Sequence, residues 1–289
     1  MAQRRFAQRA VLRFMPGEDV EAAMNAAQKL GSQGMTSVFT QLGEDIADRD
    51  EAASVTAHYR DLMGELHTRK LRTHISVKLT QLGLEIDQGF CVEQVTILAT
   101  AAAEFNNVVW IDIEGSPLVD ATLDVFRAVR ADHVNVGLCL QAYLHRTPDD
   151  LDSLLQIGAR IRLVKGAYRE PPSVAIASKS AVDTRYLELS KRLLQSDARR
   201  NGVVHGIATH DLPLIRQIKE HARATGVPRE AFEFQMLYGI RANAQQQLAA
   251  EGYPMRTLIS YGSAWFAWYM RRLAERPANL WFVAKSMLG

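Results

Sequence analysis

The sequence of 289 residues contains only two cysteines, Cys91 and Cys139. This number excludes a scaffold stapled by several disulfides and a zinc site built from four cysteines. No stretch approaches the roughly 18 uninterrupted apolar residues that a membrane-spanning helix needs. Neither sign of charge dominates, since 34 basic and 32 acidic side chains give a formal net charge of +2. Because this balance leaves no strongly basic surface, nucleic-acid binding is not the expected function.

The rest of the composition, 47% hydrophobic and 23% charged, is that of an average soluble globular protein. It argues against disorder, collagen and a coiled coil. Without a disulfide framework, the expected compartment is the reducing cytoplasm. Residues 1–15 are basic and amphipathic, and we expect them to form a short helix that ends at Pro16 and Gly17. An organellar transit peptide is the alternative interpretation of this segment.

Short apolar runs alternate with longer helical stretches along the rest of the chain. The expected strands are residues 36–41, 74–79, 108–113, 134–141, 160–165, 204–209, 232–236 and 257–260. The expected helices are residues 50–69, 91–106, 118–131, 148–157, 182–201, 212–224, 242–251 and 263–276. Such alternation indicates parallel βαβ units, and strands that are apolar at nearly every position are typical of a sheet covered on both faces.

About 250 residues of repeated strand–helix units is the size of a closed (β/α)8 barrel. No linker rich in glycine, proline or serine divides the chain. We therefore expect an α/β fold with an N-terminal helical segment at residues 1–33 and a barrel catalytic domain at residues 34–289. An open, doubly wound sheet is the alternative. It is disfavoured because no GxGxxG follows the first strand and the sequence contains no P-loop.

Polar side chains stand at the carboxyl ends of the expected strands, where barrel enzymes carry their chemistry. Lys78, Asp112 and Lys165 each interrupt an apolar strand, which is costly unless the charge is paired. A structural ion-pair network would explain any one of them, but three on the same rim favour a functional site. His205 and His210 lie five residues apart and are expected on opposite faces. Since HxH, HExxH and CxxC spacings are also absent, we expect no metal centre.

Two adjacent arginines, Arg271 and Arg272, lie in the last expected helix. Adjacent helical residues point about 100° apart, so both guanidinium groups could flank one small anion. Paired guanidinium groups favour bidentate recognition of a carboxylate. A solvated surface pair is the alternative. Glu275, one turn further on, is either a surface ion-pair partner or a group that orients the arginines.

Five motifs occur in sequence order: SVKLTQLGL, RLVKGAYREP, ATHD, FEFQMLYGIR and YMRRLAERPAN. From about residue 14 to the C-terminus, the chain resembles the proline dehydrogenases, flavin-dependent enzymes that oxidise L-proline to Δ1-pyrroline-5-carboxylate. The resemblance implies a distorted (β/α)8 barrel, non-covalent FAD and a C-terminal helix over the barrel mouth. It also implies a quinone as electron acceptor, and with it a peripheral contact between a cytoplasmic enzyme and the inner membrane.

The same resemblance implies roles for individual residues. Arg271 and Arg272 would pair with the substrate carboxylate, and Glu275 would support them. Lys78 and Asp112 would form a polar pair beneath the substrate, which we expect to be a buried ion pair. The implied walls of the substrate pocket are Leu163, Tyr168 and Leu237. The implied FAD contacts are Gln141, Arg162, Lys165, Gly166, Ala167, Thr209, His210, Glu233 and Gln235, with Arg162 as the cation near the flavin N1 or N5.

Two positions depart from the family pattern. The motif YxxRRxxE here begins with Trp268, and a tyrosine at the end of the last strand is replaced by Leu258. Both positions normally contact the substrate, so another cyclic imino acid, such as hydroxyproline, is an alternative substrate. A Schiff-base aldolase or lyase with Lys165 or Lys78 as nucleophile is an alternative from another class. A non-catalytic descendant that keeps FAD or a ligand for sensing is a third.

Overall fold

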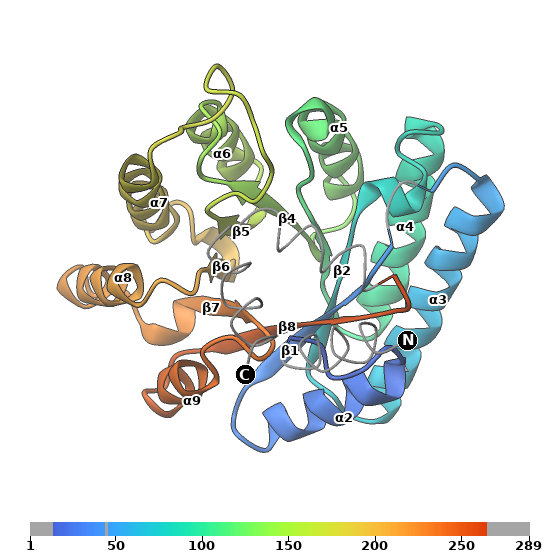
Figure 1. Ribbon diagram of the computed structural model, residues 1–289, viewed down its shortest axis with the longest axis horizontal. Coiled ribbons are helices and arrows are strands. Elements are labelled where there is room, and N and C mark those ends of the chain that lie inside the picture. The colour runs from blue at the N-terminus through green and yellow to red at the C-terminus, as the bar shows by residue number, and fades with distance from the viewer. Residues whose placement is uncertain (1–13, 44–45, 265–289) are drawn as a thin grey trace, which may run out of the picture.

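The computed structural model describes residues 14–43 and 46–264, and within them eight parallel strands close into a barrel surrounded by helices (Figure 1). The barrel closes because β8 pairs with β1, from Thr36 against Arg256 to Gln41 against Tyr261. The prediction of a closed barrel is confirmed, and the open sheet is excluded. The strands are β1 (Thr36–Gln41), β2 (Thr73–Val77), β3 (Val109–Ile111), β4 (Val136–Gln141), β5 (Arg160–Val164), β6 (His205–Ala208), β7 (Phe232–Leu237) and β8 (Met255–Tyr261).

Of the described helices, one precedes the barrel and seven follow strands β1 to β7. They are α2 (Val20–Gly31), α3 (Arg49–Thr68), α4 (Gln88–Glu104), α5 (Val119–Arg130), α6 (Thr147–Gln156), α7 (Lys179–Leu193), α8 (Leu212–Ala224) and α9 (Ala242–Ala250). Short 3₁₀ turns lie at Leu79–Leu82, Ser116–Leu118, Arg200–Gly202 and Arg229–Ala231. The expected helix at residues 1–15 and the one at residues 263–276 lie outside the described residues, apart from residues 14–15 and 263–264.

Several predicted elements run past the point where the structure ends them. The helix predicted at residues 182–201 ends at Leu193, and a 3₁₀ turn follows in which Asn201 has a φ of 58°. The strand predicted at residues 74–79 ends at Val77, and the next residue, Lys78, precedes a 3₁₀ turn. Likewise β3 ends one residue before Asp112, and β5 ends one residue before Lys165. The three charged residues therefore follow their strands rather than interrupt them, which places them at the open end of the barrel.

Helix α8 illustrates how the sequence produces the outer layer. The Asp211 side chain caps its N-terminus by accepting a hydrogen bond from the Leu214 N–H, and Pro213 occupies the first turn, where no backbone donor is needed. The buried side chains Leu214, Ile215 and Ile218 lie on one face of the helix. This spacing produces an apolar stripe that packs against the barrel, and the opposite face of the helix meets solvent.

His205 in β6 is buried in its neutral form. Its Nδ1 accepts a hydrogen bond from the Ile161 N–H at 3.2 Å, and its Nε2 donates to the Ala198 carbonyl at 2.9 Å. Burial lowers the pKa of His205 to about 4, although the hydrogen bond to Ala198 opposes this shift. Protonation would place a second N–H against the Ile161 donor. Between about pH 4 and pH 6.5, His205 is therefore neutral in the folded protein and protonated in the unfolded chain.

This difference predicts a loss of stability in weak acid. As the pH falls below about 6.5, the unfolded state binds a proton that the folded state does not bind until about pH 4. From pH 7 to pH 5 the group should remove about 2 kcal/mol from the free energy of unfolding. Urea unfolding at both pH values, on wild type and His205→Gln, measures this contribution. If the two proteins lose equal stability, His205 does not titrate as described.

Candidate active site

A hydrogen-bonded group of three side chains crosses the centre of the barrel. Arg162 in β5 is 2% exposed, and its Nη1 donates to Asp112 Oδ1 and to Ser76 Oγ, both at 2.8 Å. The Ser76 hydroxyl in turn donates to Asp112 Oδ1 at 2.9 Å. Because β2 and β5 are not neighbours in the sheet, these bonds pass through the barrel interior. They neutralise the Arg162 guanidinium and fix its orientation.

Asp112 has a partner that the sequence did not predict. The structure gives Asp112 an ion pair with Arg162, at 2.8 Å, and the expected pair of Lys78 with Asp112 stays a prediction. Arg162 and Asp112 have side chains 3% and 18% exposed, and Lys78 is half-buried at the end of β2. The reason is geometric: Arg162 lies within β5 and its long side chain reaches across the interior. Lys78 and Asp112 still share the carboxyl-terminal rim.

Arg162 also has hydrogen-bonding capacity that the described residues leave unused. Its Nε and Nη2 are buried, and neither has a hydrogen-bond partner in the part of the chain that the structure describes. The same holds for the side-chain oxygens of Gln41 at the end of β1 and of Gln81 in the 3₁₀ turn after β2. A buried donor without a partner costs about 1–3 kcal/mol, so such groups indicate a place where a ligand completes the site.

The loop after β5 is packed against β4. Gly166 has a φ of 127°, and a Cβ at this position would lie 2.3 Å from the Tyr143 ring. Ala167 donates its N–H to the Gln141 side chain at 3.2 Å, and the Tyr143 hydroxyl donates to the Tyr168 carbonyl at 3.2 Å. Gly166, Ala167 and Tyr168 are thus held at the barrel mouth by residues at the end of β4. These contacts bring together five predicted site positions, from Gln141 to Tyr168 by way of Lys165.

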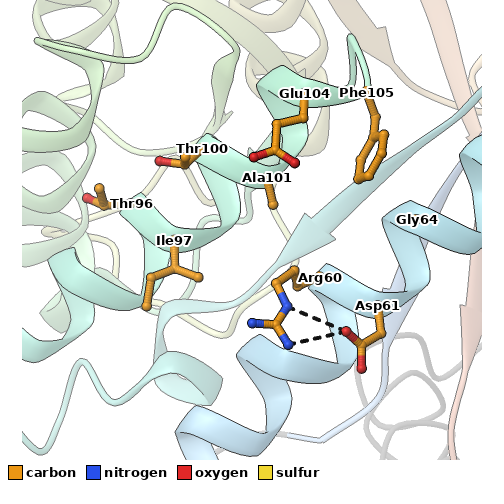
Figure 2. A pocket seen from close by; sticks show the side chains of 9 residues that line it. All are labelled: Arg60, Asp61, Gly64, Thr96, Ile97, Thr100, Ala101, Glu104 and Phe105. Carbon is orange, nitrogen blue, oxygen red and sulfur yellow. Dashed lines mark hydrogen bonds and ion pairs between the residues drawn. The ribbon is translucent and has the colours of Figure 1, made fainter.

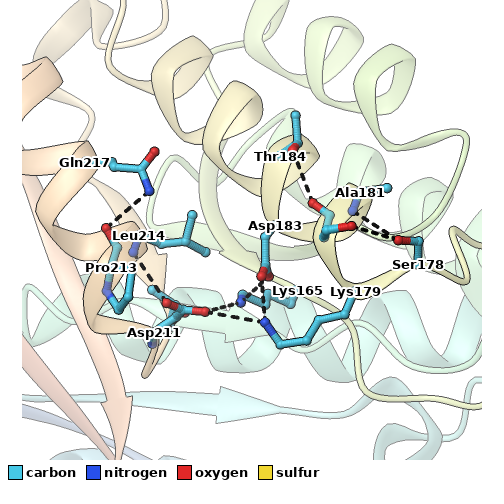
Figure 3. A network of polar contacts seen from close by, with 12 residues as sticks. Lys165, Ser178, Lys179, Ala181, Asp183, Thr184, Asp211, Pro213, Leu214 and Gln217 are labelled. Atoms are coloured by element: carbon cyan, nitrogen blue, oxygen red, sulfur yellow. Dashed lines mark hydrogen bonds and ion pairs between the residues drawn. The ribbon is translucent and has the colours of Figure 1, made fainter.

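Lys165 itself is the centre of a charged network (Figure 3). Its Nζ donates to Asp183 at 2.5 Å and to Asp211 at 2.7 Å, and Lys179 donates to Asp183 at 2.6 Å. Burial would raise the pKa of both carboxyl groups, but the hydrogen bonds from Lys165 lower it below the usual value. A Schiff-base nucleophile must be a neutral amine. An ammonium group held by two carboxylates disfavours the aldolase hypothesis for Lys165.

The predicted positions on β6 and β7 fall into two groups. Near the mouth, His210 Nε2 accepts a hydrogen bond from the Leu237 N–H at 2.9 Å, and Thr209 Oγ1 accepts one from the Asp211 N–H at 3.2 Å. Deeper in the barrel, Glu233 accepts hydrogen bonds from Gln235 at 2.6 Å and from Arg256 at 2.9 Å. Glu233 lies near the start of β7 and forms a buried ion pair with Arg256. This position is away from the carboxyl-terminal rim.

The predicted pocket residues are only partly brought together. Leu237 and Leu258 are register partners on β7 and β8, so their side chains lie on the same face. Leu163 follows Arg162 directly in β5 and therefore points away from the barrel interior, fully buried in the outer core. The structure thus places Leu163 away from the predicted pocket wall. The remaining candidates, Arg271, Arg272, Glu275 and Trp268, lie outside the described residues.

Sequence reasoning missed several residues of this site. Ser76 and Trp110 each precede a predicted site residue by two positions, and alternate residues of a strand share a face. This spacing could have identified both, because Lys78 and Asp112 were already assigned to the barrel rim. Asp183 offered no comparable signal, since it lies in α7 and meets Lys165 only through the fold.

A cavity on the surface lies away from the predicted site. A groove of about 690 Å³ runs between α3 and α4, and residues such as Arg60, Ile97 and Phe105 line it (Figure 2). None of the predicted site residues lines this groove, which lies on the outside of the barrel. Among the described residues, no cluster of three metal-binding side chains occurs, and no helix is long and apolar enough to cross a membrane.

Comparison with known proteins agrees with this arrangement. The chain is 37% identical over 275 residues to proline dehydrogenase 2 of Bacillus subtilis subsp. natto, an alignment that covers 95% of this chain and 89% of that protein. It is 36% identical over 283 residues to the proline dehydrogenase of Deinococcus radiodurans, with coverage of 96% and 89%.

A solved structure of proline utilization A from Bdellovibrio bacteriovorus has a similar fold, with a TM-score of 0.85 at 23% identity. That match covers 94% of this chain and 33% of the larger protein. The family model described as proline dehydrogenase matches residues 23–285. The chain belongs to the proline dehydrogenase family.

Proposed function

We propose that this protein is an FAD-dependent enzyme that oxidises L-proline to Δ1-pyrroline-5-carboxylate in proline catabolism. The observation that carries the proposal is the buried Arg162 guanidinium, which is fixed by Asp112 and Ser76 while two of its nitrogens remain unpartnered among the described residues. It lies within a fold and a sequence pattern shared with proline dehydrogenases over nearly the whole chain. Together these features support oxidation of an amino acid at the carboxyl end of the barrel.

The described residues fit a flavin. A flavin ring offers nitrogen and oxygen acceptors, and the free Nε and Nη2 of Arg162 are buried donors of the matching kind. The residues that would hold the cofactor are Arg162 and the loop at Lys165, Gly166 and Ala167, together with Gln141, Thr209, His210 and Gln235. Bound FAD would supply the acceptor for the hydride that leaves the carbon beside the substrate amine.

The chain contributes orientation and charge to this chemistry. The Gly166 turn brings Ala167 and Tyr168 to the mouth, and the hydrogen bonds to Gln141 and from Tyr143 keep this loop in position. Arg162 supplies a positive charge in a water-poor interior, where electrostatic effects are stronger than in water. Lys78 and Asp112 border the same rim, and Leu237 and Leu258 supply an apolar wall. No described side chain is assigned as general base, and solvent could take the amine proton.

The electron acceptor belongs to the same proposal. We infer a quinone as acceptor and a cytoplasmic enzyme that meets the inner membrane peripherally, as the family resemblance implies. Vesicle sedimentation with and without a quinone in the bilayer tests this contact directly.

Product analysis tests the proposed activity against the alternatives. The purified protein is incubated with L-proline and a soluble quinone, and the cyclic imine is trapped with o-aminobenzaldehyde. The proposal predicts imine formation that depends on L-proline and exceeds that with 4-hydroxyproline. Borohydride reduction in the presence of aldehyde substrates should leave no label on Lys165 or Lys78. Labelling of either lysine with no imine product would favour the aldolase instead.

Arg271 and Arg272 are proposed to bind the substrate carboxylate as one clamp. Each charge-assisted hydrogen bond contributes about 1.5–3 kcal/mol. Replacement of either arginine by alanine should therefore raise KM for L-proline by about tenfold or more while FAD stays bound. Steady-state kinetics with the flavin content measured in parallel tests this. Near-normal KM values in both variants would contradict the clamp.

A further inference from the structure

The Arg162 guanidinium lies over an aromatic ring. Its central carbon is 4.6 Å from the centroid of the Trp110 ring, and the Trp110 side chain is completely buried. A cation over an indole face is attracted by the ring quadrupole, and the attraction is largest where water is excluded. Trp110 therefore contacts one face of the guanidinium, while Asp112 and Ser76 bind the Nη1 edge. These three contacts leave Nε and Nη2 as the donors that face a ligand.

Trp110 is itself held in place by contacts with two neighbouring strands. Its Nε1 donates to His74 Nδ1 at 3.2 Å. Burial and the surrounding arginines lower the pKa of His74 well below its usual value, so the ring is neutral and able to accept this bond. On the neighbouring strand, Gly137 is the register partner of Trp110, and a Cβ there would lie 2.6 Å from ring carbons. The absence of a side chain at Gly137 gives the indole its space.

The same ring reaches the predicted substrate wall. Trp110 packs with Val38 and Val108 in a small apolar cluster inside the barrel, and Leu258 lies against this cluster. One side chain therefore supports both the cation of the proposed flavin site and one of the leucines beside the proposed substrate site. A shift of the indole would therefore change the positions of both Arg162 and Leu258.

We propose that Trp110 is a positioning residue: its indole, fixed by His74 and Gly137, holds the Arg162 guanidinium in the orientation that binds the flavin. The inference rests on the proposed function, because it assumes that the unpaired nitrogens of Arg162 meet FAD. Trp110 acts only through Arg162 and Leu258. Replacement of Trp110 should therefore reduce the ratio of the affinities for reduced and oxidised FAD. This effect should occur in addition to any loss of global stability.

The test measures FAD affinity and midpoint potential on purified holoenzyme. Trp110→Leu should raise the FAD Kd about fivefold and weaken the preference for reduced over oxidised FAD about five- to tenfold, on the scale of a desolvated cation–π contact. For a two-electron couple this corresponds to a potential lower by about 20–30 mV. Trp110→Phe keeps a ring under the guanidinium and should recover most of the wild-type potential. Gly137→Ala displaces the indole without deleting it and should lower the potential as Trp110→Leu does.

Phe234→Leu is the matched control, because Phe234 is a fully buried aromatic residue on β7 that packs against Phe232 and Tyr253 on the outer side of the barrel. It should lower the melting temperature without moving the potential. If wild type binds FAD, and Trp110→Leu has the wild-type Kd and potential, the positioning role is wrong. A shift equally large in Phe234→Leu would also overturn it. Failure of wild-type protein to bind FAD would instead contradict the proposed function.

Discussion

Replacement of Asp112 by alanine is expected to lower the free energy of unfolding by about 3–5 kcal/mol. The variant leaves Arg162 as a buried cation without its carboxylate partner, and Ser76 alone cannot neutralise it. The guanidinium is expected to turn toward water, so FAD should bind more weakly as well. Urea denaturation of the FAD-free protein separates the stability change from the effect on the cofactor.

A surface carboxylate provides the control for this prediction. Asp120 pairs with Arg146 at 2.7 Å, but its side chain is 80% exposed. Exposed ion pairs contribute about 0–1 kcal/mol, so Asp120→Ala should remain close to wild type. If Asp112→Ala unfolded at the same urea concentration as Asp120→Ala, the stabilising role of the buried Arg162–Asp112 ion pair would be refuted.

Replacement of Gly166 by alanine should disrupt the loop after β5 and with it FAD binding. The added methyl group would lie 2.3 Å from the Tyr143 ring, and the φ of 127° is one that L-residues with a side chain rarely adopt. Backbone strain and overpacking each cost about 1–3 kcal/mol, so a total loss of about 2–6 kcal/mol is expected. Relief of this strain must move Ala167 and Tyr168. We therefore expect FAD affinity to fall by at least about tenfold, as measured by quenching of flavin fluorescence.

A substitution at Gly202 separates the cost of backbone strain from the cost of overpacking. It also has a positive φ, of 72°, but a Cβ there would meet nothing within 4 Å. Gly202→Ala should cost only the conformational term of about 1 kcal/mol and leave FAD affinity unchanged. Equal FAD affinity in Gly166→Ala and wild type would show that the loop does not hold the cofactor.

The alternation of strands and helices was sufficient to predict the barrel, since strand patterns depend on local apolar runs. The rim could be predicted for the same reason: Lys78, Asp112 and Lys165 all follow strands that end at one side of a parallel barrel. The ends of elements were less certain. Lys78 was placed within a strand because the apolar run continues past it to Leu79, whereas the backbone turns at that point.

The partners of the charged residues could not be derived from local patterns. Arg162 reaches Asp112 across the barrel, and Lys165 meets Asp183 of the following helix, so both pairings depend on the closed fold. Leu163 was assigned to the pocket by resemblance, but its position next to Arg162 in the strand directs it outward. The alternation of faces within a strand, applied residue by residue, would have separated these two neighbours.

One measurement tests most directly whether this barrel is a flavoenzyme that oxidises proline. Purified protein containing FAD is titrated with L-proline under anaerobic conditions while the flavin absorbance near 450 nm is recorded. Loss of that absorbance is expected with L-proline, with Δ1-pyrroline-5-carboxylate formed in proportion to the flavin reduced. A protein that lacks flavin after reconstitution with FAD, or a flavin spectrum unchanged by excess L-proline, would contradict the account.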